Sequence, residues 1–212
     1  MWSWLERVKS FVSNVTDRIL GRDAVAAVGE ANTEIHVTEI RVLIDNLVND
    51  RIGIGDWQLG MREIIKESYI HEYLLGRGGV SQMMAQDYGS IGGMIADQYR
   101  YLDGFAADIA NGNLTAGQIE ARASMYARSS REAFERGKGR AWGVPDGKLP
   151  AYPGDGNSCY GLTNCRCAWE FEEVYEKDEF VGWDCFWTLG AKDPCDLCLD
   201  NTVKWNPLHI PA

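Results

Sequence analysis

The first two thirds of the chain carry apolar residues at helical spacing, and the last third alternates apolar and polar residues. Apolar side chains recur three and four positions apart over residues 2–20, which predicts an amphipathic helix or arm at residues 1–22. This helix can pack on its own protein. Alternatively, it can use Trp2 and Trp4 as anchors on a neighbouring protein or a membrane surface.

Further helical patterns predict a helical domain over residues 23–136. Its first stretch, residues 23–31, is rich in Ala, Val and Gly and is expected to be a connector. A helix is expected over residues 33–49, although the alternation at Ile35 and Val37 is also compatible with the start of a strand.

Capping residues and glycines predict where the later helices begin and end. Asp56 is expected to cap one helix, and Ser81 is expected to open a long one. Thr115 and Gln118 have the spacing of a capping box, whose helix should fade at Gly137. Four glycines inside the long helix are expected to admit a neighbouring backbone: Gly89, Gly92, Gly93 and Gly104.

Glycine and proline residues predict a linker over residues 137–153, followed by a Cys/Trp-rich β domain over residues 154–212. Alternation predicts strands over residues 168–175 and 180–189, and a short returning strand at Val203–Trp205. The predicted fold class is therefore α+β, mainly an α-helical bundle followed by a small cysteine-rich β unit that zinc holds together.

Length and charge exclude several classes of protein. The 212 residues are 45% hydrophobic, which is ordinary for a chain that folds around a core. The net charge of −10 argues against a dedicated nucleic-acid coat, and residues 151–212 contribute −7 of it. The chain has no run of 18 apolar residues, so no membrane span is predicted. The charged N-terminus does not resemble a signal peptide.

All six cysteines lie between Cys159 and Cys198. A Cys-x-x-Cys pair in one turn can direct both sulfurs at one tetrahedral ion, and a Cys-x-Cys pair with one earlier cysteine can supply the other side. The sequence therefore predicts a structural zinc site, with five candidate ligands: Cys159, Cys165, Cys167, Cys195 and Cys198. Which four of them bind stays open, as do the alternatives of disulfides, free or redox-active thiols and an iron–sulfur cluster. Cys185 is expected to be a packing residue in a strand, and His209 is a weaker candidate ligand.

The remaining candidates for chemistry are few. His36 and His71 have no partner at metal-ligand spacing and are expected to be structural or surface residues. A basic run can face DNA or an acidic partner, or simply form a solvated helix face: Arg122, Arg128, Arg131, Arg136, Lys138 and Arg140. No arrangement typical of catalysis is recognisable, so the chain is not expected to be an enzyme.

Two cysteine motifs resemble those of phage head-morphogenesis proteins, the minor head proteins of the Mu F-like family. The first is Asn164-Cys-Arg-Cys167, preceded by Leu149-Pro-Ala-Tyr-Pro-Gly-Asp-Gly-Asn-Ser-Cys159. The second is Asp193-Pro-Cys-Asp-Leu-Cys198, followed by Trp205. Family members often place the Cys-x-x-Cys pair first, whereas here it comes second, and Leu162-Thr163 replaces a His-Pro pair.

The resemblance implies a virion protein that is associated with the portal or the inner head and is present in the host cytoplasm during assembly. Its implied partners are portal or capsid proteins, packaged DNA and further copies of the same chain. An alternative class is an intracellular zinc-ribbon module that binds nucleic acid or protein. The acidic C-terminal part argues against nucleic acid as the partner of such a module.

Overall fold

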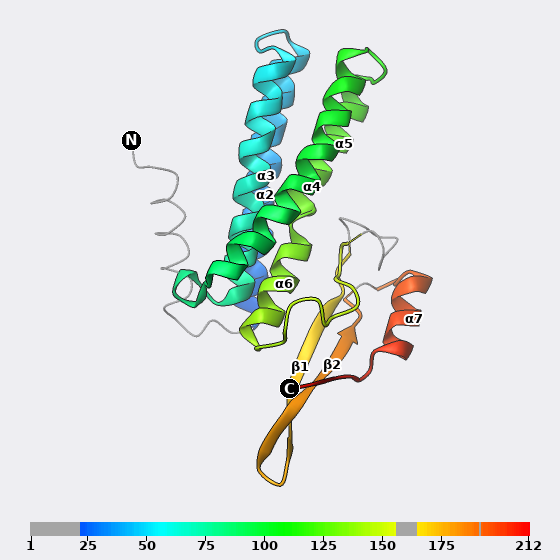
Figure 1. Cartoon of the computed structure of the whole chain (residues 1–212). Coiled ribbons are helices and arrows are strands. Elements are labelled where there is room, and N and C mark those ends of the chain that lie inside the picture. Colours follow the sequence, from blue (N-terminus) through cyan, green and yellow to red (C-terminus); the bar gives the residue numbers. More distant parts are fainter. Residues whose placement is uncertain (1–21, 156–164, 191) are drawn as a thin grey trace.

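The computed structural model describes residues 22–155, 165–190 and 192–212. Within these residues, five helices are followed by a small three-stranded antiparallel sheet and a short helix beside it (Figure 1). The predicted fold class, a helical bundle followed by a small cysteine-rich β unit, is confirmed. The helix expected near the N-terminus falls in residues 1–21, outside the described part of the chain.

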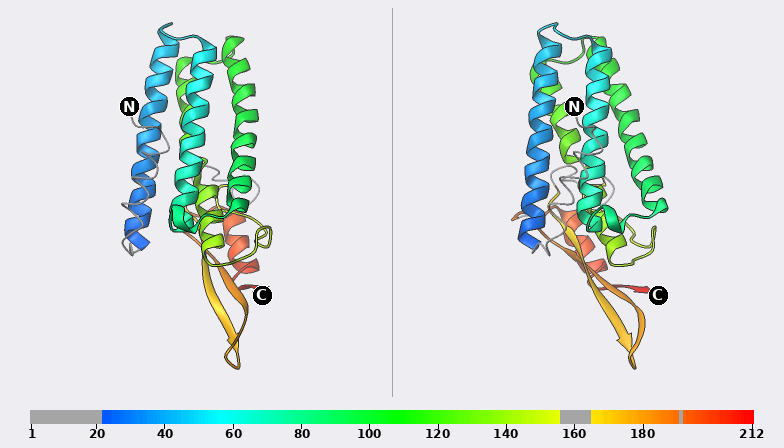
Figure 2. Two further views of the ribbon diagram at one scale, coloured as in Figure 1. Left: turned by 60° about the vertical axis from the view of Figure 1, so that its left-hand side comes forward. Right: turned by 90° about the vertical axis from the view of Figure 1, so that its left-hand side faces the viewer.

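The longest helices pack side by side around one apolar core, and the sheet lies at one end of this bundle (Figures 1 and 2). Trp57, Met61, Ile65, Leu102 and Phe105 are fully buried there. The helices are α2 (Arg22–Val48), α3 (Ile54–Arg77), α4 (Ala85–Ala110), α5 (Ala116–Arg128) and α6 (Arg131–Ala141), with a 3-10 helix η1 (Val80–Gln82) between α3 and α4.

The expected connector at residues 23–31 and the alternative strand start at Ile35 are wrong, because both stretches belong to α2. The Ala and Glu residues of the first stretch are good helix formers. Val37, Ile40 and Ile44 then bury one stripe at spacings of three and four residues, so the period of the buried face is helical.

Two expected helix starts are displaced along the chain. Gly53 is the N-cap of α3, so Asp56 lies inside its first turn, where its charge favours the positive end of the helix dipole. Helix α4 begins after Met84, and Ser81 belongs to η1. The capping box of Thr115 and Gln118 is confirmed, with each side chain bonding the backbone of the other residue.

The helix expected to fade at Gly137 is in fact two helices that break at Ser129 and Ser130, whose hydroxyls bond carbonyls of the preceding turn. Helix α6 continues through Gly137 to Ala141, into the segment expected to be a linker.

The close helix contact expected at Gly89, Gly92, Gly93 and Gly104 is also wrong, since a Cβ at each of them would meet open space. Tight packing occurs instead between α3 and α6. A Cβ on Gly76 would overlap the backbone of Phe134, and a Cβ on Gly137 would overlap that of Tyr73.

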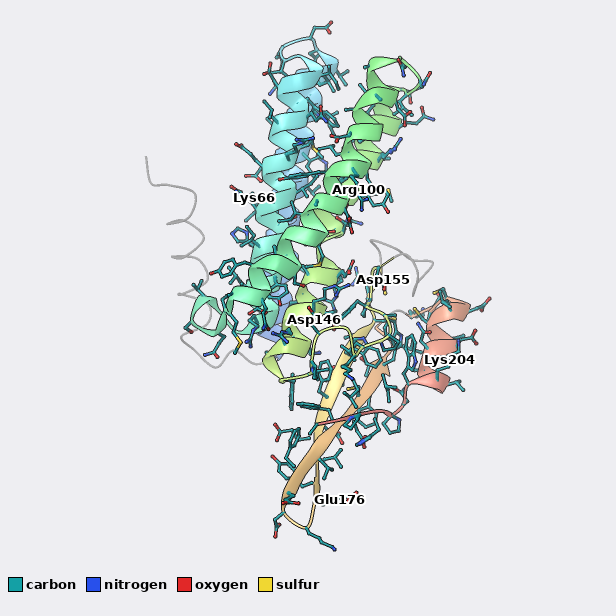
Figure 3. The ribbon with its side chains drawn as sticks, viewed as in Figure 1. Lys66, Arg100, Asp146, Asp155, Glu176 and Lys204 are labelled. Atoms are coloured by element: carbon teal, nitrogen blue, oxygen red, sulfur yellow. The ribbon has the colours of Figure 1, made fainter. Side chains whose placement is uncertain are left out.

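The sheet has the order β1-β2-β3, with β1 (Ala168–Glu176), β2 (Glu179–Thr188) and β3 (Leu208–Pro211). Strands β1 and β2 form a long hairpin in which Trp169 pairs with Trp187 and Phe171 with Cys185. The hairpin extends away from the helices, and Glu176 lies at its far tip (Figure 3). The first two strands therefore agree with the sequence pattern.

The end of the chain differs from expectation. Cys195 is the N-cap of α7 (Asp196–Lys204) and Cys198 lies in its first turn. Val203 and Lys204, expected in a returning strand, belong to the same helix, and Trp205 is its C-cap. The third strand is instead β3, which pairs with β2 from Gly182 to Cys185. Residues 203 and 204 are strongly exposed on α7, whereas Ile210 of β3 is buried, so burial selects the later strand.

Helix α6 lies between the two parts of the molecule. Gly137 and Tyr73 are in contact on its bundle side, and Gly139 faces Leu149 and Phe171 of the second core on the other. None of the helices in the described part of the chain combines the length and the apolar character that crossing a bilayer requires.

Candidate metal centre

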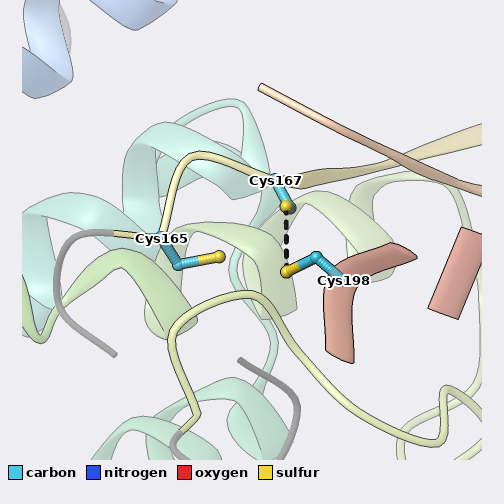
Figure 4. Close-up of side chains that lie close together, drawn as sticks. All are labelled: Cys165, Cys167 and Cys198. Atoms are coloured by element: carbon cyan, nitrogen blue, oxygen red, sulfur yellow. Dashed lines mark hydrogen bonds between the residues drawn. The ribbon is translucent and has the colours of Figure 1, made fainter. Parts of the chain in front are cut away.

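Three cysteines from two segments that are far apart in the sequence meet in the second core. The Sγ atoms of Cys165, Cys167 and Cys198 all lie within 4.8 Å of one another, and all three residues are buried. Cys165 comes from the loop before the sheet, Cys167 directly precedes β1, and Cys198 projects from the first turn of α7 (Figure 4). The Sγ atoms of Cys167 and Cys198 are 3.4 Å apart.

The backbone around β2 holds these segments together. The Trp187 N–H donates to the Trp205 carbonyl at 3.1 Å, and the Asn206 side chain donates to the Trp187 carbonyl at 3.1 Å, so the end of α7 is fixed to β2. After β2, Gly190 passes so close to the Arg166 carbonyl that a Cβ would overlap it. Gly190 therefore matters for the cluster, although only its position next to the strand end distinguishes it in the sequence.

The environment of Cys167 favours the thiolate. Its pKa is lowered to about 6, first by the hydrogen bond with Cys165 and further by Cys198 and the backbone N–H of Gly190, while burial opposes the shift. The indole Nε1 of Trp187 also contributes to this lowering, and it is buried without a hydrogen bond of normal geometry. Because thiolates are the form of cysteine that binds metals, the three buried cysteines can hold a metal ion.

Tryptophans surround the cluster. Trp169 and Trp187 are fully buried and meet edge to face at 5.2 Å between ring centroids, and Trp205 packs against both at 5.6 and 5.5 Å. The Trp169 Nε1–H donates to the Ala151 carbonyl at 2.9 Å, which attaches the segment before the sheet to the same core. The three clustered cysteines and these aromatic rings therefore belong to one hydrophobic core.

The other candidate ligands lie elsewhere or outside the described residues. Cys195 is half-buried at the N-cap of α7 and is not part of the three-sulfur cluster. Cys159 falls in residues 156–164, which the structure does not describe. His209 is exposed on β3 and contacts Asp184 at 3.0 Å.

Cys185 is fully buried between strands, as expected for a packing residue, and burial raises the pKa of its thiol to about 12. The five cysteines in the described part of the chain form no disulfide.

The basic run contacts the protein itself. Arg131 donates to the carbonyl of Cys167, just before β1, and Lys138 donates to the carbonyl of Trp169 in β1. Arg128 is exposed on α5. The other five basic residues form ion pairs within the chain: Arg122 with Asp108, Arg131 with Glu135, Arg136 with Glu132, Lys138 with Glu170 and Arg140 with Asp87. Contact of this run with DNA or a partner stays a prediction.

A cavity of about 1040 Å³ separates α2 from α6 and the Cys165 loop. Glu72 and Glu135, which line it, are buried carboxyls that the sequence analysis did not single out. Burial raises the pKa of both, and the charge of Arg131 opposes this. Glu135 accepts from Arg131 at 2.9 Å and from the Trp169 N–H at 3.0 Å, so it connects α6 to β1.

No protein-family model, no curated protein and no solved structure matches this chain.

Proposed function

We propose that this chain is a structural assembly protein of a tailed-phage head, a minor capsid or portal-associated protein, whose C-terminal unit is closed by zinc. The observation that supports it most is the buried cluster of Cys165, Cys167 and Cys198. Its sulfurs come from the Asn-Cys-Arg-Cys element and the Cys-x-x-Cys pair, the two motifs that resemble the Mu F-like minor head proteins.

Zinc is the ion that fits this donor set best. An all-sulfur set suits zinc or an iron–sulfur cluster, and zinc needs only one further ligand to complete a tetrahedral site. Cys195, one helical turn before Cys198, and Cys159, six residues before Cys165, are the two candidates for that ligand. Such an ion would join the loop before β1 to α7 and stabilise a unit that has a small core of its own.

A rigid C-terminal unit of this kind is suited to docking on a larger assembly. The β1–β2 hairpin extends beyond the rest of the molecule and ends in an acidic tip (Figure 3). Glu172, Glu173, Glu176, Asp178 and Glu179 are all exposed there. In this proposal the partners are portal or capsid proteins, and the protein resides in the virion and, during assembly, in the host cytoplasm.

The first test compares Cys198→Ala with Cys185→Ala, because both cysteines are buried in the same core and only Cys198 belongs to the cluster. Elemental analysis should find about one zinc fewer per chain in Cys198→Ala than in Cys185→Ala. Equal zinc content in the two variants would contradict the zinc part of the proposal.

The same two variants test the role in assembly. Heads purified from phage-producing cells should contain the unmodified chain and Cys185→Ala, and much less of Cys198→Ala, when bound protein is detected by mass spectrometry. Absence of the unmodified chain from purified heads would overturn the assembly role, whatever its zinc content.

A further inference from the structure

Two histidines and two glutamates that are far apart in the sequence face each other between α2 and α3. His36 and Glu39 lie three residues apart on α2, and Glu67 and His71 lie four residues apart on α3, so each pair shares one helix face. One ligand atom from each of His36, Glu39 and Glu67 lies within 4.8 Å of the other two. The rings of His36 and His71 stack with centroids 5.8 Å apart.

The distance between His36 and Glu39 fits two ligands of one ion. Nδ1 of His36 is 3.0 Å from an Oε atom of Glu39. Two atoms bound to one metal at about 2.1 Å are separated by roughly 3.0 to 3.4 Å at right or tetrahedral angles. The third group, Glu67, reaches the same place from the neighbouring helix, so an ion here would connect α2 to α3.

Burial and charge support a cation at this place. His36 is only 4% exposed, and its Nε2 is buried with no hydrogen-bond partner, so the contact with Glu39 satisfies only one ring nitrogen. Glu39 and Glu67 bring two carboxylates to this buried imidazole, and such a set of donors favours a divalent cation.

We propose that His36, Glu39 and Glu67 form a second metal site, which binds a divalent transition ion such as Mn²⁺ or Zn²⁺ and lies in the helical bundle. Imidazole nitrogen with carboxylate oxygen suits these ions, whereas Ca²⁺ and Mg²⁺ take oxygen ligands. Glu39 is exposed and Glu67 is half-buried, so an ion can reach the site from solvent. The site does not depend on the cysteine cluster or on the proposed role in a phage head.

Manganese is the most selective probe, because thiolates prefer softer ions. The full chain is titrated with Mn²⁺, and bound ion is measured as loss of the electron paramagnetic resonance signal of free Mn²⁺. We expect about one ion per chain. The variant Glu39→Gln/Glu67→Gln should weaken binding by at least about tenfold, the lower range for disturbing even the partners of metal ligands.

The matched control is Glu34→Gln/Glu63→Gln, which removes the same two charges from exposed positions on the same two helices. It should bind Mn²⁺ as the unmodified chain does, and circular dichroism should show both variants equally helical. Cys198→Ala should also keep the Mn²⁺ site. Failure of the unmodified chain to bind Mn²⁺, or equal affinity in the two double variants, would overturn the proposal without affecting the zinc and head tests.

Discussion

Neighbouring groups decide what each buried titratable side chain can do. Cys167 and Cys185 belong to the same core, yet the pKa of Cys167 is lowered by two thiols and a backbone N–H, whereas burial raises that of Cys185. The sequence distinguished the two cysteines by their spacing. It did not single out Glu72 or Glu135, because a glutamate in a helix carries no local sign that tertiary packing will bury it.

Glu72 makes a prediction about pH. Burial raises the pKa of its carboxyl from 4.5 to about 7, so the folded protein keeps a proton that the unfolded chain has lost between these values. The free energy of unfolding should therefore fall as the pH rises through this range, by about 3 kcal/mol from this group. Glu72→Gln should remove that fall and be more stable than the unmodified chain at about pH 8, as measured by urea unfolding.

The quantity to measure at each pH is the difference in the free energy of unfolding between Glu72→Gln and the unmodified chain. His71, whose pKa is lowered to about 4, changes stability in the opposite direction over an overlapping range, since its unfolded form gains a proton as the pH falls below about 6.5. The exposed Glu63→Gln variant on the same helix should leave the profile unchanged. If the free energy of unfolding of Glu72→Gln changes with pH in parallel with that of the unmodified chain, Glu72 is ionised in the folded protein over the whole pH range.

At the scale of the elements, the sequence pattern placed the close helix–helix contact at α4, whereas it lies between α3 and α6. Close packing was predicted at four glycines of α4 because they lie close together in the sequence, but they face open space. Gly76 and Gly137 form the contact, and they lie 61 positions apart, with Gly137 at the start of the segment predicted to be a linker. Periodicity identifies which face of a helix is apolar, but it does not identify the neighbouring helix, so strands β1 and β2 were predictable and this crossing was not.

Substitution of these glycines tests the crossing. Gly76→Ala should destabilise the protein by about 1 to 3 kcal/mol or more, because the new methyl group overlaps the Phe134 carbonyl and rigid backbone must move. Gly104→Ala places the same group in open space within α4 and should stabilise by about 0.5 to 1 kcal/mol. Chemical denaturation measures both, and equal effects of the two substitutions would mean that α3 and α6 do not approach as described.

On the scale of the whole molecule, two hydrophobic cores are joined through α6. The first core contains residues of α2 to α6, and the second contains the sheet, the three clustered cysteines and the segment that includes Val144, Leu149 and Tyr152. The step in composition along the sequence predicted two differently built parts. It did not predict the polar bonds between them, because Arg131 and Lys138 were expected to face DNA, an acidic partner or solvent, and Glu135 carried no sign of burial.

Glu135 should control whether the two parts open together. Glu135→Ala removes the acceptor of both Arg131 and the Trp169 N–H, and leaving these donors without it costs about 3 kcal/mol. Since the lost bonds join α6 to β1, amide exchange in β1 and β2 should rise by at least about a hundredfold, while α3 retains its protection. Hydrogen–deuterium exchange with mass spectrometry resolves the two regions.

The matched control is Glu132→Ala, one turn before Glu135 on α6. It removes the pair with Arg136, whose guanidinium also lies near Asp146 and over the Tyr152 ring, and it removes no bond to β1, so amide exchange in the sheet should change little. An equal rise of exchange in α3 and in the sheet would mean that the two cores open as one unit. No rise in either would mean that the Glu135 bonds contribute nothing to holding the sheet on the bundle. Only a rise confined to the sheet fits a molecule in which α6 carries the connection between a self-sufficient bundle and a dependent cysteine-rich unit.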